Sequence, residues 1–135
     1  MTPLELMENW LRQFPQWDCG KVYIDSTDGI PGNAGLFPKG LTEVSRKQDV
    51  TGRTTSVCRI TFDLIFVRAE EQEKNALWLL ELQQWIQQES GNAPQFGDDA
   101  QSQRIWAQQG NLRKAKQTGT VHYGVTLTVE FIKYD

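Results

Sequence analysis

The last part of the chain alternates apolar and polar side chains more regularly than any other segment. From Thr120 to Lys133, one face of an extended strand would carry Val121, Tyr123, Val125, Leu127, Val129 and Phe131. The other face would carry mainly threonines, with His122 and Glu130. A period of two is typical of a strand whose one face is buried. The threonine-rich face is therefore predicted to be solvated or covered by a partner.

The remaining segments predict a small α+β fold around this strand. Further strands are expected over Lys21–Asp25, Leu41–Lys47, Ser56–Val67 and Arg104–Lys116. The second and third would form a hairpin, and the fourth would pair with the final strand around Gln117-Thr118-Gly119, with a bulge at Gly110-Asn111. We expect one domain, residues 1–135, in which a mostly antiparallel sheet of four to five strands carries two main helices on one face.

Two helices are indicated by capping residues and by apolar stripes. The first begins at the capping box of Thr2 and Glu5, continues to Phe14, and ends before Pro15. The second extends from about Glu71 to Glu89, and its core stripe is Trp78, Leu79, Leu82, Trp85 and Ile86.

Composition excludes several functional classes. The chain has 135 residues, 39% of them apolar, and 17 acidic against 14 basic residues. A net charge of −3 does not indicate a basic nucleic-acid or membrane surface. Neither an apolar run of 18 residues nor a signal-peptide pattern is present. Cys19 and Cys58 are expected to be free thiols in a reducing cytoplasm.

Side chains for common catalytic or metal sites are scarce. His122 is the only histidine, which excludes Ser-His, Cys-His and multi-histidine arrangements, and we expect it to be structural. The acidic pairs Asp25/Asp28 and Asp98/Asp99 lack the spacing of a calcium loop. We therefore predict no enzymatic activity, no cofactor, no metal and no small-molecule ligand.

The segment Asp28–Gly40 is the strongest candidate for a binding loop. Gly29, Gly32 and Gly35 permit positive φ or close backbone approach, and two prolines stiffen the run. Within it, Leu36 and Phe37 are expected to be apolar anchors for a partner. Phosphate binding is disfavoured because the pattern is neither G-x-G-x-x-G nor a loop ending in GK[ST].

Ten residues are predicted to bind a partner. They lie in the glycine-rich segment, at the first hairpin turn and in a second loop over Asn92–Gln101, and they are Gly32, Leu36, Phe37, Lys39, Arg46, Lys47, Arg53, Phe96, Asp98 and Asp99. The basic residues at the turn have an alternative explanation, since charged strand edges also prevent aggregation. Trp17 and Trp106 remain open as interface residues, because neither lies on a helical core stripe.

Four segments resemble the minor capsid protein family of Firmicutes siphophages and prophages. They are DGIPGNAGLFPKGLTEVSRK (28–47), LLELQQWIQQ (79–88), PQFGD (94–98) and QTGT (117–120). The resemblance implies a tail-terminator-like fold and a structural role in the virion. Such proteins form a hexameric ring on the last ring of the tail tube, after assembly in the host cytoplasm. The implied partners are other copies of the chain, the major tail-tube protein and a head-completion or connector protein.

The resemblance also implies that DNA passes through the ring without specific binding, and that no membrane or catalytic residue is involved. On this basis Asp98 and Asp99, or Asp25 and Asp28, are expected to face the channel, away from the basic hairpin turn. Two alternatives remain open at this point. The chain is also compatible with another head–tail adaptor or a tube subunit, and less so with a small-molecule or phosphate-binding enzyme.

Overall fold

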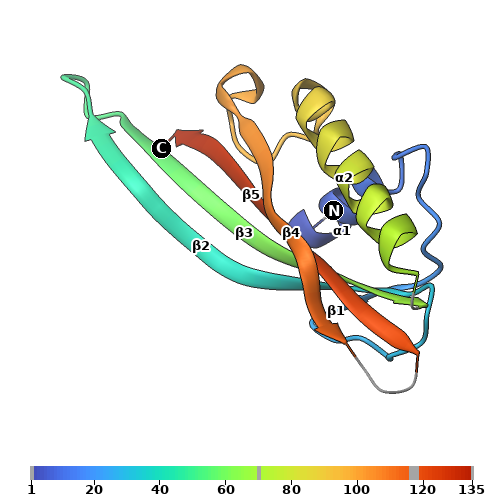
Figure 1. The fold of residues 1–135 in the computed structure, drawn as a ribbon. Coiled ribbons are helices and arrows are strands. Elements are labelled where there is room, and N and C mark those ends of the chain that lie inside the picture. The colour runs from blue at the N-terminus through green and yellow to red at the C-terminus, as the bar shows by residue number, and fades with distance from the viewer. Residues whose placement is uncertain (1, 70, 116–118, 135) are drawn as a thin grey trace.

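A five-stranded sheet carries two helices on one face (Figure 1) in the computed structural model, which describes residues 2–69, 71–115 and 119–134. The strands are β1 (Val22–Ile24), β2 (Ala34–Gln48), β3 (Thr54–Ala69), β4 (Arg104–Ala115) and β5 (Thr120–Tyr134). Their order is β1-β2-β3-β5-β4, and only β1 and β2 are parallel. The predicted α+β class is confirmed.

The two helices are α1 (Pro3–Leu11) and α2 (Gln72–Gln88). The Thr2 hydroxyl oxygen accepts from the Glu5 N–H at 3.2 Å, so the predicted cap is present. The expected end of this helix at Phe14 is wrong by one turn, because the chain continues after Leu11 in isolated turns. The bounds of α2 agree with the prediction.

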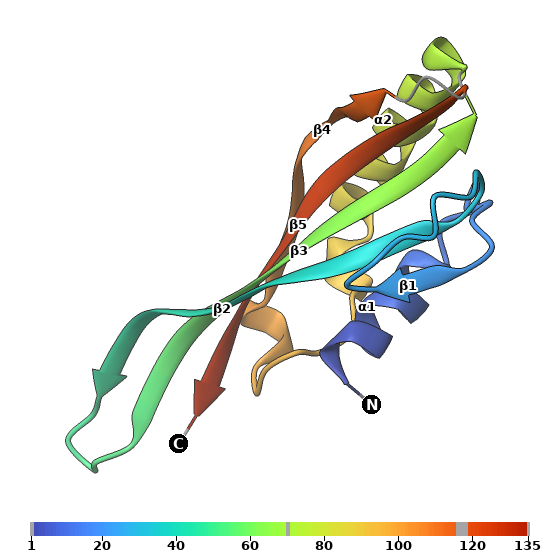
Figure 2. The ribbon, with the colours of Figure 1, turned by 90° about the horizontal axis from the view of Figure 1, so that it is seen from below.

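Aromatic packing between the helices and the sheet forms one end of the core. Trp10 of α1 lies 5.0 Å from Trp85 of α2, and Trp78 stacks edge-on against Phe66 of β3 at 4.7 Å, both measured between ring centroids. The apolar face of β5 is buried, as its alternation predicts. Viewed from below, both helices lie on the same side of the sheet (Figure 2).

The glycine-rich segment is shorter than predicted, because β2 already begins at Ala34. Three backbone pairs join Ala34–Leu36 to β1, so pairing with another strand outweighs the local turn residues. The glycine roles are confirmed: Gly29 and Gly32 have φ of 72° and 95°, and a Cβ on Gly35 would overlap the Ser26 carbonyl oxygen. The assignment of Leu36 to a loop is wrong.

The hairpin of β2 and β3 is longer than the sequence predicts, at 15 and 16 residues. Its distal part, residues 39–59, extends beyond the helices in both views and is called the arm below (Figures 1 and 2). At its tip the Asp49 carboxylate accepts the N–H groups of Thr51 and Arg53. The predicted bulge in β4 is confirmed as a register shift between Gln108 and Asn111. Gln117 and Thr118 lie outside the described residues.

The two leucines of β2 provide a test of this strand assignment. Leu36 is fully buried, whereas Leu41 is 60% exposed. We expect Leu36→Ala to lower the free energy of unfolding by about 2–5 kcal/mol, because a core cavity is left behind. The matched control Leu41→Ala should change it by no more than about 0.5 kcal/mol. Urea unfolding measures both, and equal effects would contradict the assignment.

Candidate functional site

The arm is the least buried part of the sheet. Every residue of β2 from Pro38 to Gln48 is exposed, including Leu41 and Val44. Among the residues that the structure describes, no strand pairs with its outer edge, since β1 pairs only with Ala34–Leu36. A long exposed strand with apolar side chains and a free edge is a template for binding another chain.

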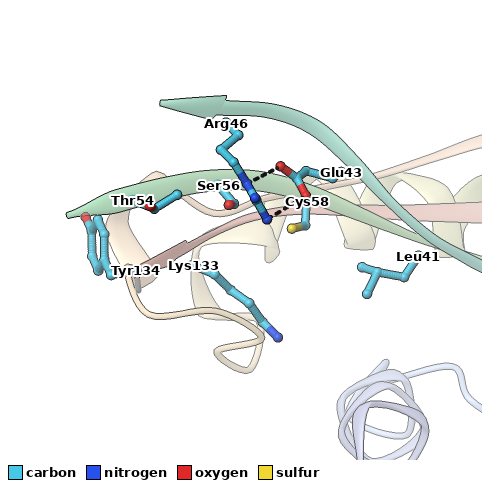
Figure 3. Close-up of a pocket in the computed structure, with 8 residues that line it drawn as sticks. All are labelled: Leu41, Glu43, Arg46, Thr54, Ser56, Cys58, Lys133 and Tyr134. Atoms are coloured by element: carbon cyan, nitrogen blue, oxygen red, sulfur yellow. Dashed lines mark hydrogen bonds and ion pairs between the residues drawn. The ribbon is translucent and has the colours of Figure 1, made fainter. Parts of the chain in front are cut away.

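A hollow of about 440 Å³ lies on the arm face that is continuous with the helix-covered side of the sheet (Figure 3). Register places Glu43 and Arg46 on this face, because they pair with Cys58 and Ser56. Lys133 also pairs with Ser56, whereas Tyr134 at the end of β5 pairs with Thr55. The arm hollow is lined by Leu41, Glu43, Arg46, Thr54, Ser56, Cys58, Lys133 and Tyr134.

One ion pair inside the arm hollow leaves a surplus of positive charge there. Arg46 Nε lies 2.9 Å from Glu43 Oε1, and both side chains come from β2 (Figure 3). Lys133 adds a second cation from β5. Leu41 contributes an exposed apolar surface beside these charges. The hollow therefore suits an apolar segment that carries negative charge.

The second predicted loop packs against the end of β5. The N–H of Asp98 donates to the Ile132 carbonyl oxygen at 2.8 Å, and its carboxylate accepts the Tyr134 N–H at 2.7 Å. Asp99 accepts from Gln101 N–H and from the Tyr134 hydroxyl. Phe96 is half-buried and packs against the core.

For Asp98 and Asp99, the expected separation from the basic turn is wrong. The guanidinium carbon of Arg53 lies 4.8 Å from the centre of the Tyr134 ring, and Tyr134 contacts both Asp98 and Asp99. The acids and the base thus lie at one end of the sheet because β5 pairs with β3 up to Thr55. Hydrogen bonds from Ser102, Gln101 and Tyr134 lower the pKa of Asp99.

The other predicted residues do not share one surface. Leu36 is buried in the core and is unavailable to a partner. Phe37 and Lys47 pair with Asp63 and Thr55, which places them on the face opposite the arm hollow. Lys39 is exposed at the base of the arm. Gly32 lies in the loop, where its N–H donates to the Val67 carbonyl oxygen at 2.9 Å.

On the helix-free face, an ion-pair network joins three strands at the base of the arm. Glu130 of β5 accepts from Arg59 of β3 and from Arg104 of β4, each at 2.8 Å. Both guanidiniums lie over the Trp106 ring, at 5.6 and 5.4 Å from its centre. Hydrogen bonds from Arg104 and then Arg59 lower the pKa of Glu130. This network holds the arm to the rest of the sheet.

Trp17 is part of the core contacts and is not a free interface residue. Its ring centre lies 5.7 Å from that of Phe66 and 6.3 Å from that of Trp78. Both cysteines are buried free thiols, as expected. Burial raises the pKa of Cys19 to about 12, so its thiolate is not formed at neutral pH.

The outer surface of α2 carries an apolar and acidic patch that sequence reasoning missed. Leu77 and Leu80 are each 57% exposed, and Glu71, Glu73 and Lys74 lie at the N-terminal end of the same surface. Lys74 Nζ lies 3.5 Å from Glu71 Oε2, so the surface keeps a net negative charge through Glu73. We call these five residues the helix patch. The signal was available in the sequence, because both leucines fall outside the stripe of Trp78, Leu79, Leu82, Trp85 and Ile86 that packs on the sheet.

Comparison with protein-family models and with curated protein sequences finds no match. Within the described residues, no group of three or more His, Cys, Asp and Glu side chains is arranged to hold a metal ion. No helix in the described ranges has the length and apolar character needed to cross a membrane.

The Glu130 network predicts a specific pH dependence of stability. The pKa of Glu130 is lower in the folded state than its unfolded-state value near 4.5. The ionised carboxylate therefore contributes fully to folding stability above pH 4.5, and this contribution is lost as the pH falls through the folded-state pKa. We expect Glu130→Gln to unfold at lower urea than the wild type at pH 7, with a difference that shrinks on acidification. Urea midpoints from pH 7 to pH 3 measure this, and a constant difference would contradict it.

Proposed function

We propose that this protein is a structural subunit of a phage or prophage tail, a minor capsid protein of the tail-terminator type. In this role several copies form a ring on the last ring of the tail tube, stop its growth and offer a surface to the head connector. The observation that carries the proposal is the arm, which extends an exposed strand beyond the helices.

The arm is better explained by assembly than by the stability of the single chain. Its exposed β2 residues add no core, yet the hairpin keeps its pairing from Leu41–Ile60 to Gln48–Thr54. Five basic residues and only two acidic ones lie between positions 39 and 59. Such a segment suits contact with an acidic surface of another subunit.

The resemblance of four segments to the minor capsid family supports the same role and adds the identity of the partners. These are the major tail-tube protein and a head-completion protein, with DNA passing through the lumen without specific binding. Assembly takes place in the bacterial cytoplasm, and the protein then remains in the neck of the virion. The arm is equally suited to another head–tail adaptor or a tube subunit, which an end-specific binding assay distinguishes.

Hydrogen bonding in the glycine-rich loop disfavours a phosphate-binding enzyme. The N–H groups of Gly32 and Ala34 donate to the carbonyl oxygens of Val67 and Lys21. The Ile30 N–H donates to the Asp28 carboxylate at 2.9 Å. These three N–H groups are therefore already used within the chain and are not free for an anion, and the bond from Ile30 lowers the pKa of Asp28.

Tail-tube capping provides the test. We expect the purified protein to bind one end of tail tubes and to stop their elongation, which negative-stain imaging and tube-length distributions measure. The variant Arg46→Ala/Lys47→Ala/Arg53→Ala should bind at least about tenfold more weakly, because it removes arm charges without touching the core. Binding along the whole tube would favour a tube subunit, and bare ends at saturating protein would contradict the proposal.

A further inference from the structure

We propose that the arm hollow of one copy binds the helix patch on α2 of the next copy, as a head-to-tail contact. This inference rests on the proposed function and identifies the surfaces by which the copies join. The arm hollow and the helix patch each carry at least one exposed leucine side chain, and their net charges are opposite.

Charge is the first argument. The arm hollow is lined by two cations, Arg46 and Lys133, and one acid, Glu43, which leaves a net positive charge. The segment from Glu71 to Glu89, which contains α2, has four acidic residues and one basic residue. Opposite potentials on two surfaces favour their encounter and fix their orientation.

Exposed apolar side chains are the second argument. Leu41 is 60% exposed at the arm hollow, and Leu77 and Leu80 are each 57% exposed on the helix patch. An exposed helix stripe with two leucines suits a concave groove that has an apolar side chain at its rim. The exposed part of β2, about 33 Å long, is also long enough to accommodate α2, which is about 25 Å long.

The position of the two surfaces excludes a contact within one chain. In both views the tip of the arm and the N-terminal end of α2 lie at opposite ends of the molecule (Figures 1 and 2). The arm hollow therefore meets the helix patch only of another copy. Two different patches on one chain form a heterologous contact, which generates a ring when the rotation between copies closes.

Site-directed cross-linking tests the contact. Leu41→Cys and Leu77→Cys are prepared as separate variants, mixed, and treated with a short thiol–thiol cross-linker, both free and bound to tail tubes. We expect a 41–77 cross-link in at least about tenfold excess over that of the control pair Thr42→Cys with Leu77→Cys. Thr42 is the matched control because it pairs with Arg59 on the opposite face of the same strand. The unsubstituted protein, treated in the same way, shows any cross-link formed by the two buried native cysteines.

Charge reversal gives a second readout that does not depend on new cysteines. Lys133→Glu and Glu73→Lys should each weaken self-association, measured by sedimentation at low salt, and the chain carrying both should recover it. The control Lys47→Glu makes the same change on the opposite face of the arm, where Lys47 pairs with Thr55. Equal loss in this control, or no recovery in the double variant, would overturn the contact.

The outcomes separate this contact from the proposed function. Capped tubes without a 41–77 cross-link would overturn the contact and leave the tail role intact. A cross-link from Leu41→Cys to the tube protein in place of a second copy would also overturn it. Cross-linked copies that leave tube ends bare would support the contact and contradict the tail role.

Discussion

The pairing of β3 with β5 is the interaction on which the rest of the structure depends. Fifteen consecutive residue pairs join the strands, from Thr55–Tyr134 to Ala69–Thr120, without a register shift. These pairs make the central sheet about 50 Å long, whereas the 17 residues of α2 extend only about 25 Å. The helix layer therefore covers about half of the sheet, and the exposed arm is a direct consequence of this mismatch.

Side-chain periodicity predicted the elements that bury a face. The alternation in β5 and the stripe of α2 give the correct strand and helix, because burial itself imposes those periods. The arm has no such period, since it has no core to face, and its length is set by pairing alone. Leu36 shows the same limit: glycines and prolines around it indicate a loop, but pairing with β1 places it in a buried strand.

The sequence predicted several of the charged residues of the candidate site, but it did not predict which face of the sheet each of them lies on. Arg46, Lys47 and Arg53 are adjacent to a turn in the sequence, yet Arg46 and Lys47 lie on opposite faces of the strand. Asp98 lies beside the end of β5 because its loop hydrogen-bonds to Ile132 and Tyr134. Such contacts join segments more than 30 residues apart, and no local pattern contains them. The exposed Leu77 and Leu80 were visible as leucines outside the core stripe of their helix.

The direction of the arm matters as much as its surface if copies join head to tail. A heterologous contact closes into a ring only when each copy is rotated by the same fixed angle, and a flexible arm would allow open chains. The ion pairs of Glu130 with Arg59 and Arg104 cross three strands at the base of the arm, on the face away from the arm hollow. In the ring proposed above, fixing this base would fix the angle between copies, although the Glu130 network lies on the face away from the arm hollow.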